Sequence, residues 1–389
     1  MTKKWSSRLT FFAFVVLMVG LGSNDSLRGI FSTIFQEHFS LTTTQLGLIV
    51  TASYIGNLVF LLVGGNLSTR FSKKRVLQVL ILIWMAALAL FAFTSNYTVL
   101  LIGMALALGS STLLNTTMNL ITPLLFATAP GFFVNFLFFT QEIGTSGSQY
   151  VLGSHADGFA FWQHTNLVLL ILGAVAFVLL LFCNVPEEAA APADAPAQKG
   201  GYDWRIIVPY VLVFGFYFIA EHGVMNWMVA YGVDGLGLPQ ASAAKYLSVF
   251  FGGMMIGRLC LSPLVDKLGA LKSLAAFGGV SCVLYLIGSL GGAVTMPIWA
   301  ISGLSFSILY PTLVMSIRLY FPAQQVSGAA GTILSIASLA DILFNVGFGK
   351  LVDMTGYAVS IRVLPLSALA FFIVFMLFTK FCKPTQKLK

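Results

Sequence analysis

The sequence predicts an all-α membrane protein with about twelve transmembrane helices in two six-helix repeats. Of its 389 residues, 58% are hydrophobic and only 9% are charged, whereas soluble domains carry roughly 25% charged residues. Apolar stretches of about 20 residues, the length that crosses a bilayer, recur along the whole chain. Basic residues gather in alternate connections between these stretches, which is typical of cytoplasmic loops in membrane proteins.

The first half contains six predicted spans. The basic segment Met1 to Trp5 precedes an apolar run much longer than the core of about 7 to 15 residues in a signal peptide. No small-residue cleavage pattern ends that run, so we expect a retained first helix. Apolar runs between polar breaks place the six helices near 8–36, 43–69, 75–94, 97–126, 131–153 and 162–184.

The second half has the same organisation, with helices expected near 205–232, 239–266, 271–290, 294–319, 325–352 and 358–381. Between the halves, residues 186–204 include AAAPADAPAQKGG, which is too rich in Ala, Pro and Gly to pack and too polar to span. We therefore expect an N-terminal bundle at 1–185, a cytoplasmic linker at 186–204 and a C-terminal bundle at 205–389.

The distribution of Lys and Arg predicts the orientation of the chain. An even number of helices places both termini on one side, and a cytoplasmic N-terminus puts most basic residues in the cytoplasm. Short loops, a compact length and the lack of an organelle address favour a bacterial inner (plasma) membrane. The residues placed inside are Lys3, Lys4, Arg8, Arg70, Lys73, Lys74, Arg75, Lys199, Arg205, Lys267, Lys272, Arg318, Lys380, Lys383, Lys387 and Lys389.

Several function classes are disfavoured by the sequence. The four cysteines lie in apolar surroundings with no short spacing, so they predict neither disulfides nor a metal site. The net charge of +8 follows the loops rather than forming a nucleic-acid patch. There is no Walker loop, zinc pair or nucleophile elbow. We therefore expect no enzyme, no ATP-driven pump, no cofactor and no nucleic-acid partner.

The two halves also resemble each other in the order of their polar landmarks. In the first half an intramembrane acid, a polar turn before the second helix and a basic loop follow in order, and the second half repeats them. The offsets are 196, 197 and 197 residues for the pairs Asp25 and Glu221, Leu41 and Leu238, and Arg70 and Lys267. Such regularity predicts two parallel six-helix repeats, as in many transporter folds.

The loop after the second predicted helix carries a family resemblance. Its sequence GNLSTRFSKKRV resembles the G-x-L-x-D-R-x-G-R-K/R loop of the major facilitator superfamily, with Thr69 and Ser72 in place of Asp and Gly. The counterpart after the eighth helix, SPLVDKLGALK, keeps the acid. The resemblance implies the major facilitator fold and gate loops, with candidate gate residues Gly65, Arg70, Lys73, Arg258, Asp266, Lys267 and Gly269.

Three further segments resemble the fucose permease branch of sugar–proton symporters. They are GSNDSLRGIFSTIFQEHFSLTTTQLGLI in the first helix, AEHGVMNWMVAYG in the seventh and GLSFSILYPTLVMS in the tenth. In that branch the fourth helix carries a functional Glu, and Asn115 stands at this position here. The resemblance implies that Asp25 is the proton-coupling acid. Because the second family acid is missing, coupling through Asp25 alone, coupling assisted by Glu221 and the absence of coupling all stay open.

Intramembrane acids are the first candidates for function, because a charge at the bilayer centre costs roughly 2.5 to 3.5 kcal/mol. Asp25 lies about 24 Å along the first helix at 1.5 Å per residue, and Glu221 occupies the matching position in the second repeat. Both could carry a proton, but Arg28 could simply pair with Asp25, and Glu221 could anchor its helix at the interface. Glu142 is a third candidate, for which helix packing is equally plausible.

Polar and aromatic side chains in the spans are the candidates for solute binding. Asn115 and Asn119 share one helix face, as do Asp341 and Asn345. Trp227 and Tyr310 could stack on a sugar ring or pack between helices. The full candidate set is Asn24, Asn115, Asn119, Asn135, Gln141, Asn226, Trp227, Tyr310, Asp341 and Asn345.

Together these features predict a secondary transporter in which two bundles rock around a site built from the first, fourth, fifth, seventh, tenth and eleventh helices. Amide side chains donate and accept hydrogen bonds without charge, which suits a neutral sugar, and proton symport is the expected drive. We expect a monomer in the lipid bilayer, with a small solute and protons as partners. The alternatives are a proton-antiport exporter of drugs or metabolites, and a non-transporting sensor or lipid-handling protein.

Overall fold

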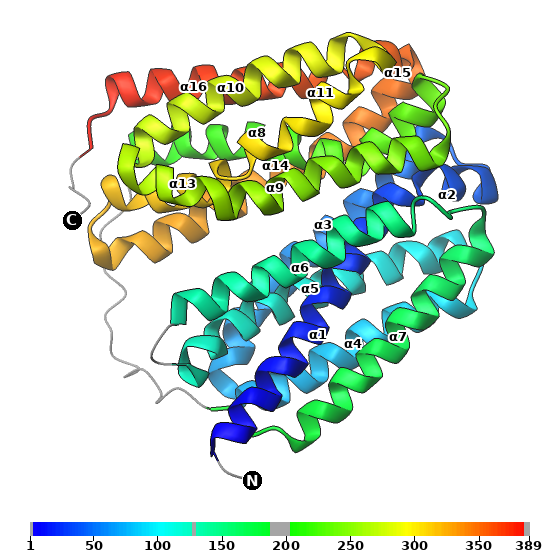
Figure 1. The fold of residues 1–389 in the computed structure, drawn as a ribbon, viewed down its shortest axis with the longest axis vertical. Coiled ribbons are helices and arrows are strands. Elements are labelled where there is room, and N and C mark those ends of the chain that lie inside the picture. Colours follow the sequence, from blue (N-terminus) through cyan, green and yellow to red (C-terminus); the bar gives the residue numbers. More distant parts are fainter. Residues whose placement is uncertain (1–2, 127–129, 187–202, 385–389) are drawn as a thin grey trace. The chain divides into compact units, whose positions relative to one another are not determined.

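The computed structural model of the chain describes residues 3–126, 130–186 and 203–384. Within these ranges all regular structure is helical, and eleven helices are long and apolar enough to cross a membrane. The twelfth expected span is α6 (Pro130–Val151), some of whose side chains lie outside the described residues. The all-α membrane fold predicted from the sequence is confirmed. The chain divides into two compact units, Met1–Ala195 and Pro196–Lys389 (Figure 1).

In the N-terminal unit the helices pack in a pattern that sequence order alone does not give. Helix α6 packs along α1, α3 packs along α5, and α4 lies against both α5 and α7. The other bounds are α1 (Lys3–Ile30), α2 (Ser32–Phe39), α3 (Thr43–Arg70), α4 (Lys73–Phe93), α5 (Tyr97–Leu125) and α7 (Phe159–Phe182).

The first predicted span, 8–36, is divided into two helices. The Ser32 hydroxyl donates to the Gly29 carbonyl over 2.8 Å, and such back-bonding bends helices. The main-chain bonds from Phe31 to Leu27 and from Phe35 to Phe31 remain at 2.9 Å, so the interruption is a local bend. Helix α2 then stops at Ser40, whose φ of 50° is left-handed.

Glycines bring the main chains of neighbouring helices together. A Cβ on Gly22 of α1 would overlap the Gln141 carbonyl of α6, and one on Gly144 would overlap the Val19 carbonyl in return. Small residues at such positions let membrane helices approach closely, since lipid provides no hydrophobic drive for association. This seam holds α6 against the part of α1 that carries Asp25.

In the C-terminal unit α8 (Trp204–Ala230) packs against both α14 and α16. It ends in η1, a π-helical turn. The bounds are η1 (Tyr231–Gly235), α9 (Gln240–Leu268), α10 (Ala270–Leu290), η2 (Gly292–Val294), α14 (Ala323–Thr355), α15 (Tyr357–Ser360) and α16 (Val363–Phe381).

The tenth predicted span, 294–319, is not one helix. It is broken into α11 (Met296–Ile301), α12 (Gly303–Phe306), α13 (Leu309–Ser316) and η3 (Ile317–Leu319). Two causes are visible. The Ser302 hydroxyl bonds the Trp299 carbonyl at 2.5 Å, and Pro311 has no N–H to give the Ser307 carbonyl. That carbonyl instead accepts a long bond of 3.5 Å from Arg258 Nε of α9.

Candidate functional site

The N-terminal acid lies between α1 and α5. Asp25 accepts a hydrogen bond from the Ser111 hydroxyl over 3.1 Å. Arg28, one turn further along α1, supplies a nearby positive charge, and its guanidinium lies 5.6 Å from the Tyr54 ring centroid. Neither Asp25 Oδ1 nor Arg28 Nε has a hydrogen-bond partner among the described residues. The site therefore holds a half-buried acid, one oxygen of which is buried with unused hydrogen-bonding capacity, beside a buried cation.

A chain of amides continues from this acid along α5. Asn115 follows Ser111 by one turn, and its Nδ2 donates to Gln141 Oε1 of α6 over 2.6 Å. Asn119 Nδ2 donates in turn to Asn115 Oδ1, also over 2.6 Å. Among the described residues, Asn119 Oδ1 has no partner. The three amides are thus hydrogen-bonded in a row that starts one helical turn from Ser111 and ends in a buried acceptor.

The other N-terminal candidates are placed differently. Asn24 Oδ1 accepts from Trp84 Nε1 of α4 over 3.2 Å, which turns this amide toward the interior of the bundle. Glu142 is half-buried on α6, beside Gln141 in the chain. The side chain of Asn135 lies outside the described residues.

The acid of the second repeat belongs to a buried cluster. Glu221 of α8 is 9% exposed, and its charge acts on the hydroxyls of Tyr217, Tyr285 and Tyr310. Arg258 of α9 acts on Tyr217 and Tyr310 as well. An acid and a base from neighbouring helices therefore face the same tyrosines, one of which is the predicted solute contact Tyr310.

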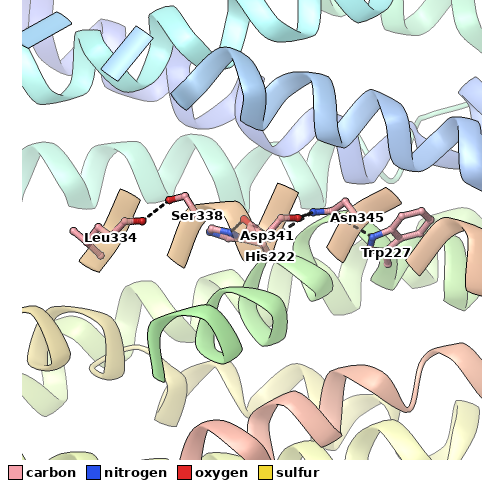
Figure 2. A network of polar contacts seen from close by, with 6 residues as sticks. All are labelled: His222, Trp227, Leu334, Ser338, Asp341 and Asn345. Carbon is pink, nitrogen blue, oxygen red and sulfur yellow. Dashed lines mark hydrogen bonds and ion pairs between the residues drawn. The ribbon is translucent and has the colours of Figure 1, made fainter. Parts of the chain in front are cut away.

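A second polar network joins α8 to α14, and Figure 2 shows its members in line. His222 Nδ1 lies 2.5 Å from Asp341 Oδ2. Asn345 Nδ2 donates to the Asp341 carbonyl at 2.8 Å and to Oδ1 at 3.4 Å. Trp227 Nε1 donates to Asn345 Oδ1 at 2.9 Å. Four side chains from two helices thus fix one another.

This network places three of the predicted solute-binding residues within one helix interface. Trp227 is fully buried, with its ring centroid 4.9 Å from that of Phe348, while Asp341 and Asn345 are 2% and 0% exposed. The sequence interpretation passed over His222 as a site residue. Its position directly after Glu221 in an apolar span was the available signal.

The gate residues are only partly described. The side chains of Arg70 and Asp266, and the burial of Gly65, lie outside the described residues. Of the gate residues that are described, Lys73 begins α4. The solute-binding candidate Asn226 is buried. Lys267 is exposed near the end of α9, and Gly269, at φ 81°, is the single residue between α9 and α10. Most of the predicted linker also lies outside the described residues.

A cavity of about 460 Å³ opens in the N-terminal unit, away from the polar line. It lies between α1, α6 and α7 and has mostly apolar walls, including Val19, Ile143 and Val168. His164 also lines it, but Asp25 and the amide chain do not. Val168 and Ile143 are exposed, so the cavity faces the surroundings of the bundle.

Comparison with known proteins decides the family. The model of the Major Facilitator Superfamily matches residues 10–340. The chain belongs to the major facilitator superfamily. Facilitator-superfamily relatives include the L-fucose-proton symporter of Escherichia coli (strain K12), which is 24% identical over 74% of this chain and 75% of that protein. The glucose/galactose transporter of Brucella abortus biovar 1 (strain 9-941) is 26% identical over 82% of this chain and 81% of that protein.

Among solved structures, the D-xylose-proton symporter matches this facilitator with a TM-score of 0.78 at 16% identity, covering 97% of this chain and 98% of the other. At that identity the likeness shows the fold alone. Together with the family match, it confirms the major facilitator fold that the loop sequences predict. The protein is a transporter and not an enzyme.

Proposed function

We propose that this transporter is a proton-coupled symporter of a neutral sugar that works by alternating access. The observation that carries the proposal is the line formed by Asp25, Ser111, Asn115, Asn119 and Gln141 in the N-terminal unit. It places one ionisable acid, bonded to Ser111, one helical turn from a row of hydrogen-bonded, uncharged amides. Proton binding and solute binding would therefore take place on contiguous side chains.

The chemistry of this line suits coupling. When Asp25 is ionised it only accepts hydrogen bonds, and the Ser111 hydroxyl supplies one. A proton on the carboxyl group turns Oδ1 or Oδ2 into a donor and removes a buried charge, which costs roughly 2.5 to 3.5 kcal/mol at the membrane centre. Protonation would thus prepare Asp25 to donate to a solute oxygen. It would also lower the free-energy cost of the conformational change that closes the site around that carboxyl group.

The amides favour a neutral polyhydroxylated solute. Each of Asn115, Asn119 and Gln141 can donate and accept, as sugar hydroxyls do, without adding charge. The relatives whose names print a sugar, the L-fucose-proton symporter and the glucose/galactose transporter, support this class of solute and, in the first case, protons as the coupling ion. Asn115 in place of the second family acid leaves Asp25 as the main proton carrier of this unit.

The setting of the protein is also proposed. The positive loops support cytoplasmic termini and a cytoplasmic linker, and the bacterial relatives support an inner membrane. We propose that the protein acts as a monomer in the bilayer. Cysteine-accessibility labelling at Lys3 and Lys383 in intact cells tests the topology, and labelling from outside would contradict it.

Uptake into proteoliposomes tests the transport proposal. Labelled L-fucose, D-glucose, D-galactose and D-xylose are offered with and without a gradient that is acidic outside. One sugar should accumulate above equilibrium only with the gradient. Asp25→Asn should abolish this accumulation and preserve sugar exchange, because the Asn side chain keeps the shape of the acid but cannot ionise. Unchanged accumulation by that variant would refute the coupling role, and transport of no sugar would refute the solute class.

One observation favours a second function. The apolar cavity between α1, α6 and α7 opens to the surroundings of the bundle, which is what lipid handling predicts. Transfer of a fluorescent phospholipid between the leaflets of the same proteoliposomes tests this alternative. Transfer that persists in the Asp25→Asn variant, in the absence of sugar transport, would favour lipid handling over symport.

A further inference from the structure

The pair His222 and Asp341 has no part in the proton chemistry described so far. It brings the imidazole of α8 within 2.5 Å of the carboxylate of α14. At 1.5 Å per residue, His222 lies about 27 Å along the axis of α8 from Trp204, and Asp341 lies about 27 Å along the axis of α14 from Ala323. An ionisable pair at this depth in two spanning helices requires an explanation, because charges inside membranes mark functional paths more often than fixed structure.

The two partners differ in their access to solvent. The side chain of Asp341 is 3% exposed, whereas that of His222 is 25% exposed. The imidazole therefore keeps an exposed face while the carboxylate stays enclosed. Asn345 donates to Asp341 and is itself oriented by Trp227, so the carboxylate is held in one position as a fixed negative group (Figure 2).

We propose that His222 and Asp341 form a second proton-binding site, in the C-terminal unit, that loads and releases a proton during transport. This inference rests on the proposed proton symport. With Nδ1–H donating to Asp341, a proton from water adds to Nε2, and the pair changes from a net charge of −1 to 0. Only one N–H bond forms on loading, and the same bond breaks when the proton returns to water.

Imidazole suits this role because it is the side chain whose charge changes between about pH 5 and 8. The fixed carboxylate compensates the imidazolium, so loading the site replaces a buried net negative charge with a neutral pair. Phe218 stacks on the His222 ring, with centroids 5.3 Å apart and planes 5° apart. Phe218 covers a face of the imidazole and Asp341 bonds its Nδ1. The ring can therefore exchange a proton at Nε2 without rotating.

Other charged or titratable groups on the packed helices set the field around the pair. Glu221 and Arg258 carry opposite charges, and both act on Tyr217 and Tyr310. Lys350 and Asp353 lie on later turns of α14, about 14 Å or more from Asp341 along the axis at 1.5 Å per residue. Other ionisable groups on these elements include Arg205, Tyr210, Tyr217, Asp234, Lys245, Tyr246, Lys267, Lys272, Tyr285, Tyr310, Arg318, Tyr357 and Lys380.

A matched pair of variants tests the inference. His222→Asn keeps a donor near the position of Nδ1, so the bond to Asp341 and the fold should survive, but Asn cannot take up a proton. His155→Asn is the control, because the Nδ1 of this exposed histidine lies 2.8 Å from the neutral Val151 carbonyl rather than a carboxylate. Circular dichroism and size-exclusion profiles establish that both variants are folded.

The transport measurement is the proton-to-sugar ratio, obtained from reversal potentials in proteoliposomes. In His222→Asn the ratio should fall by one proton per sugar, and the inflection of sugar exchange between about pH 5 and 8 should disappear. The His155→Asn control should match the wild type in both. A folded His222→Asn variant with the wild-type ratio and pH profile would overturn the proposal and leave the pair as a fixed link between α8 and α14.

A second measurement does not depend on transport. The protein is labelled with ¹⁵N-histidine in detergent, and the signal absent from His222→Asn is followed from pH 5 to 9. A change of protonation state within this range supports the site even if no sugar is found, in which case only the proposed function fails. A His222 signal that stays in one state throughout would overturn the proposal even if Asp25-dependent symport is established.

Discussion

Replacing Trp227 by Phe decides whether this indole packs the C-terminal bundle or binds solute. In the structure Trp227 is fully buried, donates to Asn345 over 2.9 Å and lies against Phe348. Phe retains the ring contact but removes the donor and the second ring. We expect a loss of stability with little direct effect on solute affinity.

The magnitude follows from two losses. The smaller ring leaves roughly 40 Å³ unfilled, which at about 24 cal/mol per Å³ costs about 1 kcal/mol. Asn345 Oδ1 loses its donor, and hydrogen bonds between transmembrane helices contribute about 0.6 kcal/mol on average and at most about 1.7 kcal/mol. Trp227→Phe should therefore lower the free energy of unfolding by about 2 kcal/mol.

The assay is unfolding by sodium dodecyl sulfate in mixed micelles, followed by circular dichroism, with the sugar dissociation constant measured on the same samples. Trp204→Phe is the control, because Trp204 is 57% exposed at the start of α8 and surface changes stay within about 0.5 kcal/mol. The packing interpretation is refuted if Trp227→Phe unfolds like the wild type but binds the sugar at least tenfold more weakly, a loss of about 1.4 kcal/mol.

Three further variants test the N-terminal unit. Ser111→Ala, which removes the hydroxyl 3.1 Å from Asp25, should alter the pH dependence of sugar uptake but spare sugar exchange at its optimum; identical pH profiles would contradict the contact. Asn115→Leu interrupts the amide chain at both of its bonds and should raise KM for the sugar about tenfold, or 1.4 kcal/mol; unchanged initial-rate kinetics would exclude a role in binding. Gly22→Val pushes against the α6 main chain and should cost about 1–3 kcal/mol of unfolding free energy, whereas Gly147→Ala, which meets open space, should be silent; equal stabilities would argue against the seam.

Helix positions were predictable because bilayer thickness sets the length of each span. The third predicted span, near 75–94, corresponds to α4, which runs from Lys73 to Phe93. The break in the tenth span was not predicted. Besides the Ser302 hydroxyl, it depends on Pro311 together with Arg258, a residue of another helix that donates to the freed Ser307 carbonyl. Local sequence supplies the proline but not the partner.

The types of residue in the candidate sites were largely visible in the sequence, whereas their pairings were not. Asp341 and Asn345 were expected on one face, and they do interact. That Asp341 meets His222 depends on how α8 and α14 align, over a separation of 119 positions. Helical periodicity gives the face of each helix but not the register between two helices. Trp84, which holds Asn24, was missed for the same reason.

The connection between α9 and α10 consists of Gly269 alone, in a backbone conformation that glycine adopts readily. A joint of one residue has no slack, so a displacement at the end of α9 is passed directly to the start of α10. A spin label at the exposed Lys267 would therefore report on two helices at once. A longer flexible insertion at Gly269 would separate the movements of α9 and α10. The difference between the Lys267 label signals with and without the insertion would measure how much of the transport cycle depends on the short connection.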